Sequence, residues 1–148
     1  MLVHVNTILS DKISAYRKGY SSQHVLLKLT EEFSLDNNQI VGAFLMDLSK
    51  AFDCIPHELL IAKLSAYGFD IKTLKFILSY LKGRKQSVNI KGTLSTCMDV
   101  LAGVPQGSIL GPVIFNMFLN DITTIFERFS LNNFADDNTL DAHASSVT

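Results

Sequence analysis

The chain has 148 residues, of which 47% are hydrophobic and 18% are charged, and its formal net charge is −1. This is a globular composition, and the length is sufficient for one domain with a core of its own. No apolar run reaches the roughly 20 residues that a membrane-spanning helix needs. The two cysteines, Cys54 and Cys97, are too few for a disulfide framework. We therefore expect an intracellular protein without a membrane segment.

The first half of the chain combines helical and strand-like patterns. Apolar residues at helical spacing predict a helix over 21–33, and a turn is expected at 36–38. The nearly continuous apolar run over 40–46 predicts a buried central strand. Two further helices are predicted over 56–67 and 71–81, and a glycine follows each of them.

The second half of the chain contains more turn residues. The alternation over 86–90 predicts a strand, and residues 94–101 are expected to pair with it across Gly92-Thr93. Residues 103–108 have the composition of a loop, and residues 110–126 have the pattern of one helix. Because helices and strands do not alternate strictly and no linker divides the chain, an α+β layer fold is predicted.

The last predicted element of the chain carries two adjacent acids at its turn. Asp136 and Asp137 follow the apolar run 129–135 and precede a short strand at 138–140, which predicts a hairpin with acids at its turn. Neighbouring carboxylates repel each other unless a cation or water lies between them. Asp47 ends another strand-like run. Two strand ends that carry Asp predict a two-metal site for phosphoryl transfer.

The distribution of charge is more informative than its total. Residues 56–98 carry seven lysines and arginines against two acids, whereas residues 99–148 carry one arginine against six acids. A basic middle and an acidic tail would suit a surface that grips phosphates beside a site that holds cations. The alternative is that both are ordinary solvated faces.

Five segments carry motifs beyond these patterns: residues 16–22, 43–53, 81–86, 102–112 and 134–137, the last being Phe-Ala-Asp-Asp. In this order they resemble motifs of reverse transcriptases. The motifs are the arginine-bearing fingers segment, the first catalytic motif, a basic turn, the template- and nucleotide-handling motif, and the aromatic-Ala-Asp-Asp motif. The style is that of non-LTR (LINE-type) retrotransposons, and the resemblance covers nearly the whole chain.

This resemblance implies a right-hand polymerase fold made of palm and fingers, in which an antiparallel catalytic hairpin packs on helices. Residues 1–148 would form a partial reverse transcriptase domain with interleaved fingers and palm segments, without the N-terminal part and the thumb. The implied partners are an RNA template, a DNA primer and deoxynucleoside triphosphates, and the implied locations are the cytoplasm and the nucleus.

The resemblance also assigns the metal ligands. Asp47 and Asp136 would hold two Mg²⁺ ions, or Mn²⁺ in their place, because hard cations prefer oxygen ligands. Asp137 would either bind metal directly or orient the turn. Leu48 would contribute only its backbone carbonyl. Asn138 departs from the Thr that usually follows the acid pair in this family.

Further positions would handle the nucleotide. Phe52, five residues after Asp47, would act as a gate whose ring leaves no room for a ribose 2′-hydroxyl; the alternative is core packing. Gln106 and Gly107 would line the nucleotide pocket, unless they form a plain turn before a helix. Core packing for Phe52 and a plain turn for Gln106 and Gly107 are both common roles of these residue types.

The basic residues would contact phosphates. Arg17 and Lys18 would meet the triphosphate or the template phosphates, where Arg offers a bidentate fork. Arg84 and Lys85 would touch the template backbone. For both pairs the alternative is a solvated basic turn.

Three functions compete on the sequence. The first is an RNA-directed DNA polymerase, and the second is an RNA-directed RNA polymerase, against which Phe52 argues because that enzyme must accept a 2′-hydroxyl. The third is an inactive truncated relic with at most a nucleic-acid-binding or structural role.

Overall fold

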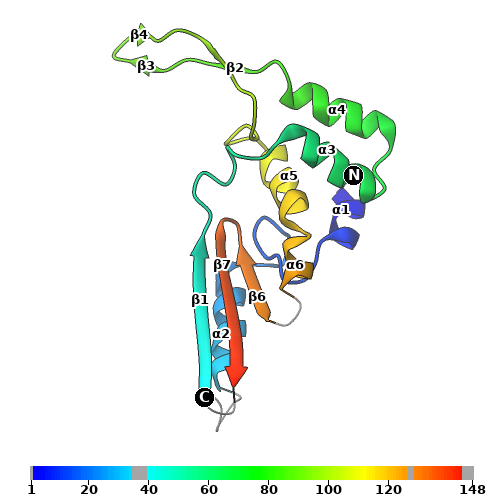
Figure 1. Ribbon diagram of the computed structural model, residues 1–148, viewed down its shortest axis with the longest axis vertical. Helices are drawn as coiled ribbons and strands as arrows, with labels where there is room; N and C mark the ends of the chain where they lie inside the picture. The colour runs from blue at the N-terminus through cyan, green and yellow to red at the C-terminus, as the bar shows by residue number, and fades with distance from the viewer. Residues whose placement is uncertain (1, 35–39, 127–128, 145–148) are drawn as a thin grey trace. The chain divides into compact units, whose positions relative to one another are not determined.

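The computed structural model describes residues 2–34, 40–126 and 129–144. It divides into two compact units: unit 1 comprises Met1–Ser49 and Leu119–Thr148, and unit 2 comprises Lys50–Phe118. Both helices and antiparallel strands are present (Figure 1), which confirms the predicted α+β class. The assignment of palm and fingers within residues 1–148 stays a prediction.

Unit 1 is built around a three-stranded antiparallel sheet in the order β1-β7-β6. Helix α2 packs against β6, as Figure 1 shows. The elements of this unit are α1 (Leu2–Ile8), α2 (Ser22–Ser34), β1 (Ile40–Asp47), α6 (Ile122–Ile125), β6 (Ser130–Phe134) and β7 (Asp137–Ala144). The predicted terminal hairpin is therefore confirmed, and its second strand is longer than expected.

The strand predicted over 40–46 is present as β1, but the prediction that it is buried and central is wrong. Strand β1 pairs with β7 and lies at the edge of the sheet. Phe44 is 62% exposed and Leu45 is 76% exposed. A continuous apolar run is typical of a strand covered on both faces, but the run itself does not specify what covers it. The predicted turn at 36–38 lies outside the described residues.

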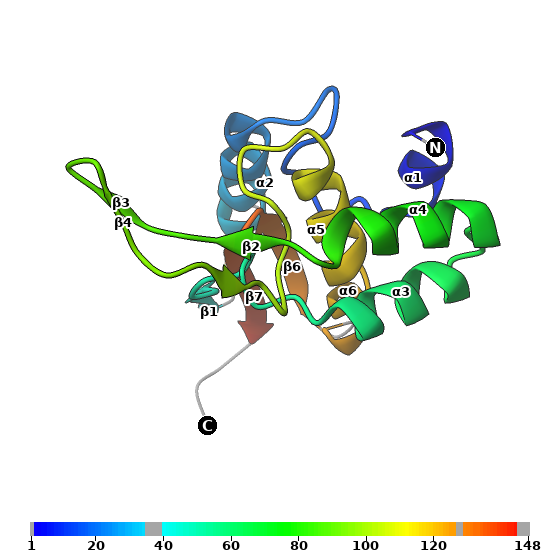
Figure 2. The same ribbon diagram turned by 90° about the horizontal axis from the view of Figure 1, so that it is seen from above.

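Unit 2 packs three helices together and extends an arm from them (Figures 1 and 2). Its apolar core includes Leu60 and Leu64 from α3, Ile77 and Leu81 from α4, and Phe115 from α5, all at most 3% exposed. The elements are α3 (His57–Ala66), α4 (Ile71–Leu81), β2 (Lys85–Gln86), β3 (Asn89–Ile90), β4 (Thr93–Leu94), β5 (Met98–Asp99) and α5 (Leu110–Leu119). Helices α3 and α4 match the predicted ranges.

Local capping fixes where α3 and α4 begin and end. Gly68, with φ +82°, follows α3 and donates its N–H to the Ser65 carbonyl. The Asp70 carboxylate accepts hydrogen bonds from the backbone N–H groups of Lys72 and Thr73 at the start of α4. The Thr73 hydroxyl also donates to this carboxylate, and together these bonds lower the pKa of Asp70.

The arm is a long hairpin whose pairing is interrupted. Strands β3 and β4 pair around a two-residue turn at Lys91–Gly92, one position earlier than predicted, and β2 pairs separately with β5. Lys91 has φ +50° and Gly92 has φ +87°, the backbone conformation that a twisted two-residue hairpin requires.

The prediction of one helix over 110–126 is also wrong, because α5 ends at Leu119 and a short α6 follows. Asn120 accounts for the break. Its side-chain Oδ1 accepts a hydrogen bond from the Ser10 N–H at 2.8 Å, and its Nδ2 donates to the Ile8 carbonyl at 3.1 Å. These contacts join residues about 110 positions apart, so helical periodicity does not reveal them. In the described part of the chain, no helix has the length and apolarity to cross a membrane.

Candidate active site

Two of the predicted metal ligands are paired directly on neighbouring strands of the sheet. Asp47, the last residue of β1, is paired with Asp137, the first residue of β7. Directly opposed residues in an antiparallel pair project to the same face with Cβ atoms about 5 Å apart. Like charges in this position are destabilising, and both side chains are exposed. The fold thus holds two carboxylates together at a solvent-accessible strand end.

Asp136 lies in the two-residue turn between β6 and β7. Its carbonyl accepts a hydrogen bond from the Leu48 N–H at 3.2 Å, which ties the turn to the end of β1. The preceding Ala135 has φ +59°, a sparsely populated conformation for a residue with a Cβ. The three predicted acids therefore come from one end of the sheet, and Asp136 lies on a turn with a strained backbone.

The donor set suits an open magnesium site. Among the residues that the structure describes, no three His, Cys, Asp or Glu side chains form a group that could hold a metal ion, so Asp47, Asp136 and Asp137 do not form a three-ligand cluster as they lie. Mg²⁺ is usually bound by one or two carboxylates together with water and substrate phosphates rather than by a cage of protein ligands. The opposed pair Asp47 and Asp137, with Asp136 beside it, fits this requirement.

A groove of about 570 Å³ adjoins these acids within unit 1. Apolar side chains of α2, including Val25 and Leu29, form one wall, and Leu45 and Phe134 of the sheet form another. Asp47 and Asp137 also line the groove. The carboxylates therefore lie beside a largely apolar surface.

Two buried asparagines that the sequence analysis did not assign a role hold this turn. The Asn133 amide Nδ2 donates to the Ala135 carbonyl at 2.8 Å, and the Asn138 Nδ2 donates to the Asp136 carbonyl at 3.0 Å. The departure at Asn138 was noted in the sequence, but nothing local indicated its pairing with Asn133.

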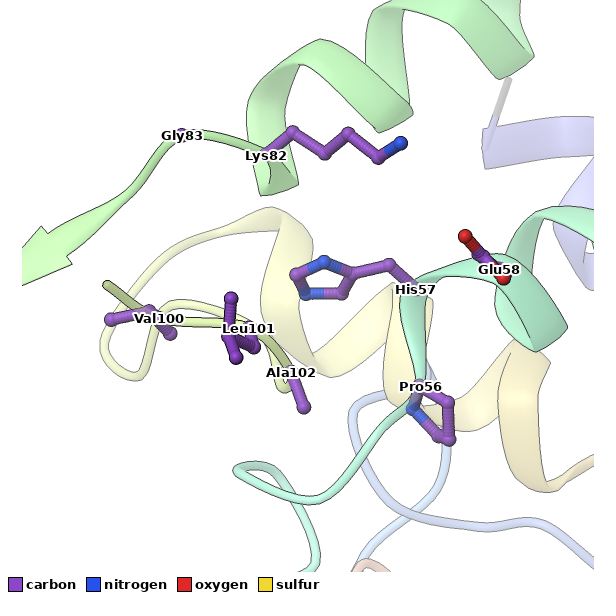
Figure 3. Close-up of a pocket in the computed structure, with 8 residues that line it drawn as sticks. All are labelled: Pro56, His57, Glu58, Lys82, Gly83, Val100, Leu101 and Ala102. Atoms are coloured by element: carbon purple, nitrogen blue, oxygen red, sulfur yellow. The ribbon is translucent and has the colours of Figure 1, made fainter.

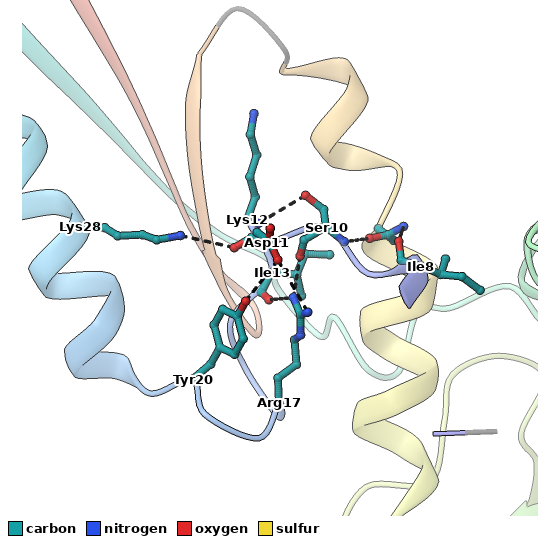
Figure 4. Close-up of polar contacts among 9 residues, drawn as sticks. Ile8, Ser10, Asp11, Lys12, Ile13, Arg17, Tyr20 and Lys28 are labelled. Atoms are coloured by element: carbon teal, nitrogen blue, oxygen red, sulfur yellow. Dashed lines mark hydrogen bonds and ion pairs between the residues drawn. The ribbon is translucent and has the colours of Figure 1, made fainter. Parts of the chain in front are cut away.

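Arg17 binds its own loop (Figure 4). Its guanidinium donates to the Ser10 carbonyl at 2.7 Å and to the Ile13 carbonyl at 2.9 Å, and it lies 4.5 Å from the centre of the Tyr20 ring. The Arg17 side chain is 8% exposed, whereas Lys18 is exposed. The predicted contact of this pair with phosphates stays a prediction, and the geometry favours Lys18 as the accessible cation.

Residues 103–108 form the predicted loop in unit 2. The Gly103 N–H donates to the Ile55 carbonyl, and the Val104 N–H donates to the Phe52 carbonyl, both at 2.8 Å. Gln106 is exposed and donates from Nε2 to the Asp53 carboxylate at 3.0 Å. Asp53 therefore holds Gln106, and it does not cap α3, whose first turn has no side-chain cap. Gly107, with φ +75°, is also exposed.

Gly103 is the position in this loop where a side chain is excluded. A Cβ there would lie 2.6 Å from both the Cα and the carbonyl oxygen of Asp53, and φ is +78°. We expect Gly103→Ala to destabilise unit 2 strongly. Gly68→Ala is the matched control, because Gly68 has φ +82° and no atom within 4 Å of the added Cβ.

Urea unfolding would measure both variants. The backbone strain at positive φ should cost each about 1–3 kcal/mol, and the clash should cost Gly103→Ala about 1–3 kcal/mol more. Equal losses in the two variants would contradict the close approach of Gly103 to Asp53.

Phe52 stacks on Phe115 within unit 2. The ring centroids are 4.2 Å apart, with an angle of 18° between the planes, and Phe52 is half-buried while Phe115 is 1% exposed. One face of the Phe52 ring is thus supported by the core. Its role as a sugar gate beside Asp47 stays a prediction.

Arg84 and Lys85 differ in their surroundings. The half-buried Arg84 donates from Nη2 to the Gly103 carbonyl at 2.6 Å and from Nε to the Leu81 carbonyl at 2.9 Å. Lys85 is 62% exposed and lies 3.6 Å from Asp99, a surface ion pair of little energetic weight. Of the two, Lys85 is the one available to a nucleic acid backbone.

His57, for which no sequence pattern predicts a role, also holds this loop. It is 7% exposed, and its Nε2 donates to the Gly103 carbonyl at 2.8 Å. Figure 3 shows its ring between Lys82 and the backbone at Leu101, in a pocket of about 430 Å³. Arg84 and His57 therefore converge on one carbonyl at the start of the candidate nucleotide loop.

A match to a protein-family model shows which family this chain belongs to. The family model described as reverse transcriptase (RNA-dependent DNA polymerase) matches residues 1–146. The chain belongs to the reverse transcriptase family. The opposed acids lie in two of the segments on which the predicted resemblance was based, residues 43–53 and 134–137.

Curated relatives are polymerases of transposons. The chain is 32% identical over 117 residues to the probable RNA-directed DNA polymerase from transposon BS of Drosophila melanogaster, a match that covers 78% of this chain and 13% of that protein. The RNA-directed DNA polymerase from mobile element jockey of the same species is 34% identical over 101 residues, which are 68% of this chain and 11% of that protein. The predicted resemblance to non-LTR retrotransposon enzymes is confirmed.

Solved structures of telomerase share the fold. A Candida albicans telomerase, in complex with a fragment of telomeric RNA, gives a TM-score of 0.71 over 95% of this chain and 29% of its own, at 13% identity. An apo telomerase from Candida tropicalis gives 0.68 over 98% of this chain and 33% of its own. These likenesses agree with a palm-and-fingers polymerase fold.

Proposed function

We propose that this chain provides the catalytic acids of an RNA-directed DNA polymerase of a non-LTR retrotransposon. The observation that carries the proposal is the opposition of Asp47 and Asp137 across β1 and β7, with Asp136 tied to Leu48 in the adjoining turn. Two directly opposed carboxylates at an exposed strand end cost energy unless a cation offsets their repulsion.

Asp47, Asp136 and Asp137 would supply oxygen ligands to two Mg²⁺ ions, with Mn²⁺ as a substitute, and Leu48 would add its backbone carbonyl. When bound, these ions lower the pKa of the primer 3′-hydroxyl and stabilise the leaving pyrophosphate. The exposure of Asp47 and Asp137 leaves room for the substrate phosphates that complete such sites. The chain's own task is to hold the carboxylates at one place.

Unit 2 would handle the incoming nucleotide and the template. The loop that Arg84 and His57 hold at Gly103 would present Gln106 and Gly107 to the nucleotide. Phe52, supported by Phe115, would exclude the 2′-hydroxyl. The exposed cations Lys18 and Lys85 would contact phosphates of the triphosphate and of the RNA template.

Palm and fingers segments would interleave along residues 1–148, with the catalytic hairpin β6-β7 packed on α2 as part of the palm. Primer, template and deoxynucleoside triphosphates are the proposed partners. The sequence similarity to the transposon polymerases and the fold shared with the telomerase structures support this assignment.

Template-dependent synthesis tests the proposal. A reverse transcriptase that contains this chain should extend a DNA primer on an RNA template with deoxynucleotides in the presence of Mg²⁺, and should stop when EDTA removes the metal. Preferred use of ribonucleotides would support the RNA polymerase alternative. Absence of synthesis on any template, with Asp47, Asp136 and Asp137 intact, would support the relic alternative.

A further inference from the structure

Within the described residues, the proposed function leaves unexplained a pair of buried asparagine side chains on the catalytic hairpin. Asn133 of β6 and Asn138 of β7 are opposed in the register, one step from the pair Phe134 and Asp137. Their exposed fractions are 0% and 1%. Neither residue belongs to the metal or nucleotide roles described above.

The two side chains form a connected set of hydrogen bonds under the turn. Asn133 Nδ2 donates to the Ala135 carbonyl at 2.8 Å and to Asn138 Oδ1 at 2.9 Å. Asn138 Nδ2 donates to the Asp136 carbonyl at 3.0 Å. Both carbonyls of the two-residue turn are thereby fixed from the strand side, and the Asp136 carbonyl also receives the Leu48 N–H.

The arrangement is not the one that stability alone would favour. Asn133 Oδ1 is buried and accepts no hydrogen bond from the described residues, which carries a desolvation cost. An apolar pair of similar shape at the two positions would avoid that cost. The turn is also strained, because Ala135 has φ +59°. Strain of this kind persists only where the surroundings over-determine the backbone.

The backbone of Asn133, from which these side-chain hydrogen bonds start, is itself held by hydrogen bonds. The Asn133 N–H donates to the Lys12 carbonyl and its carbonyl accepts from the Ser14 N–H, both at 3.0 Å. Arg17 in turn binds the carbonyls of Ser10 and Ile13, which braces the same segment (Figure 4). The Asn133 side chain therefore extends to the turn from a strand whose backbone is itself hydrogen-bonded to residues 12 and 14.

We propose that Asn133 and Asn138 are positioning residues that hold the Ala135–Asp136 turn, and thereby direct the Asp136 and Asp137 carboxylates toward the metal ions. They touch neither metal nor substrate. The inference rests on the proposed polymerase function. It deepens that function by naming what fixes the acids before any ligand binds.

The first test needs neither metal nor substrate. Asn133→Leu, Asn138→Leu and the double variant would be compared with the parent chain by thermal unfolding and by hydrogen exchange of residues 134–138. Each loss of a turn hydrogen bond should speed exchange there by about twofold to tenfold. The double variant should also unfold at a somewhat lower temperature, because the Ala135 carbonyl loses its side-chain donor.

A matched control is Asn116→Leu on α5, where the original asparagine is 2% exposed. It makes the same chemical change at a buried site and should leave exchange at 134–138 unaltered. Unchanged turn exchange in all three hairpin variants would overturn the proposal, whatever the polymerase activity.

The second test uses a reverse transcriptase that contains this chain. A misplacement of about 1 Å costs roughly a hundredfold in rate, so kcat should fall by about tenfold to a hundredfold while KM for deoxynucleotides changes little. Because the two amides form one connected set, the double variant should lose about as much as either single variant. Faster turn exchange with an unchanged kcat would overturn the positioning role. An inactive parent enzyme with protected turn amides would instead count against the proposed function alone.

Discussion

Replacing Asp136 with alanine should abolish nearly all nucleotide incorporation by a reverse transcriptase that contains this chain. The carboxylate is proposed to stabilise charge that develops in the transition state, so its loss should cost at least about 4 kcal/mol. That corresponds to a thousandfold or larger decrease in kcat, at about 1.4 kcal/mol for each factor of ten. Primer extension under single-turnover conditions would measure it.

Asp47→Ala should have the same effect, because Asp47 ends the neighbouring strand of the same site. Asp137→Asn separates the two roles left open for that residue, because direct ligation predicts a loss near that of Asp136→Ala and turn orientation predicts a smaller one. Asp70→Asn is the control: it changes the exposed acid at the N-cap of α4 but keeps the cap. Near-normal extension by Asp136→Ala would reject the assignment.

Changing Phe52 to valine should alter the choice of sugar. If the ring excludes the 2′-hydroxyl, the ratio of ribonucleotide to deoxynucleotide incorporation should rise by about tenfold or more, the size of discrimination that a pocket contact supplies. Deoxynucleotide use should fall less than ribonucleotide use rises, because the ring mainly excludes. If Phe52 is only a core residue, stability should fall by about 1–3 kcal/mol and the ratio should stay constant.

Phe115→Val is the matched control, since it removes the same ring stack from the buried side. It should lower the free energy of unfolding and reduce both incorporation rates, and because the Phe52 ring is retained, their ratio should change much less than in Phe52→Val. An unchanged ratio in Phe52→Val would remove the main reason for preferring DNA synthesis over RNA synthesis.

Local patterns predicted the parts of the fold that depend on near neighbours. Helices α3 and α4 follow from apolar spacing and from the glycines behind them, and the β6-β7 hairpin follows from two short strands around an acid turn. The pairing of β1 with β7 places Asp47 opposite Asp137, and the metal site predicted from these strand ends stays a prediction.

Long-range contacts explain the errors. The break between α5 and α6 arises from Asn120 binding Ser10 and Ile8, and helical periodicity contains no information about such partners. Likewise, the apolar run of β1 has the composition of a buried strand, yet the strand lies at a sheet edge.

The candidate site was predictable in its acids and less so in its supports. Carboxylates in a recognisable motif indicate metal chemistry. In the sequence, Arg17 and Arg84 look like free phosphate-binding groups, and only the structure shows the carbonyls that they bind. Asn133 and His57 gave no sequence signal, because a buried amide or imidazole that binds a backbone carbonyl has no spacing rule. The departure at Asn138 was the one local clue.

Iron-directed cleavage of the chain tests the central claim, that Asp47, Asp136 and Asp137 form one metal site. In the presence of hydrogen peroxide and ascorbate, Fe²⁺ substituted for Mg²⁺ reduces the peroxide to hydroxyl radicals that cut the backbone near the bound ion, and ascorbate returns the iron to Fe²⁺. We expect cuts confined to residues 46–48 and 135–138, lost in the Asp47→Asn/Asp137→Asn variant and retained in Asp99→Asn, which alters an exposed acid of the arm. Cleavage elsewhere, or cleavage that the double variant leaves unchanged, would contradict the account.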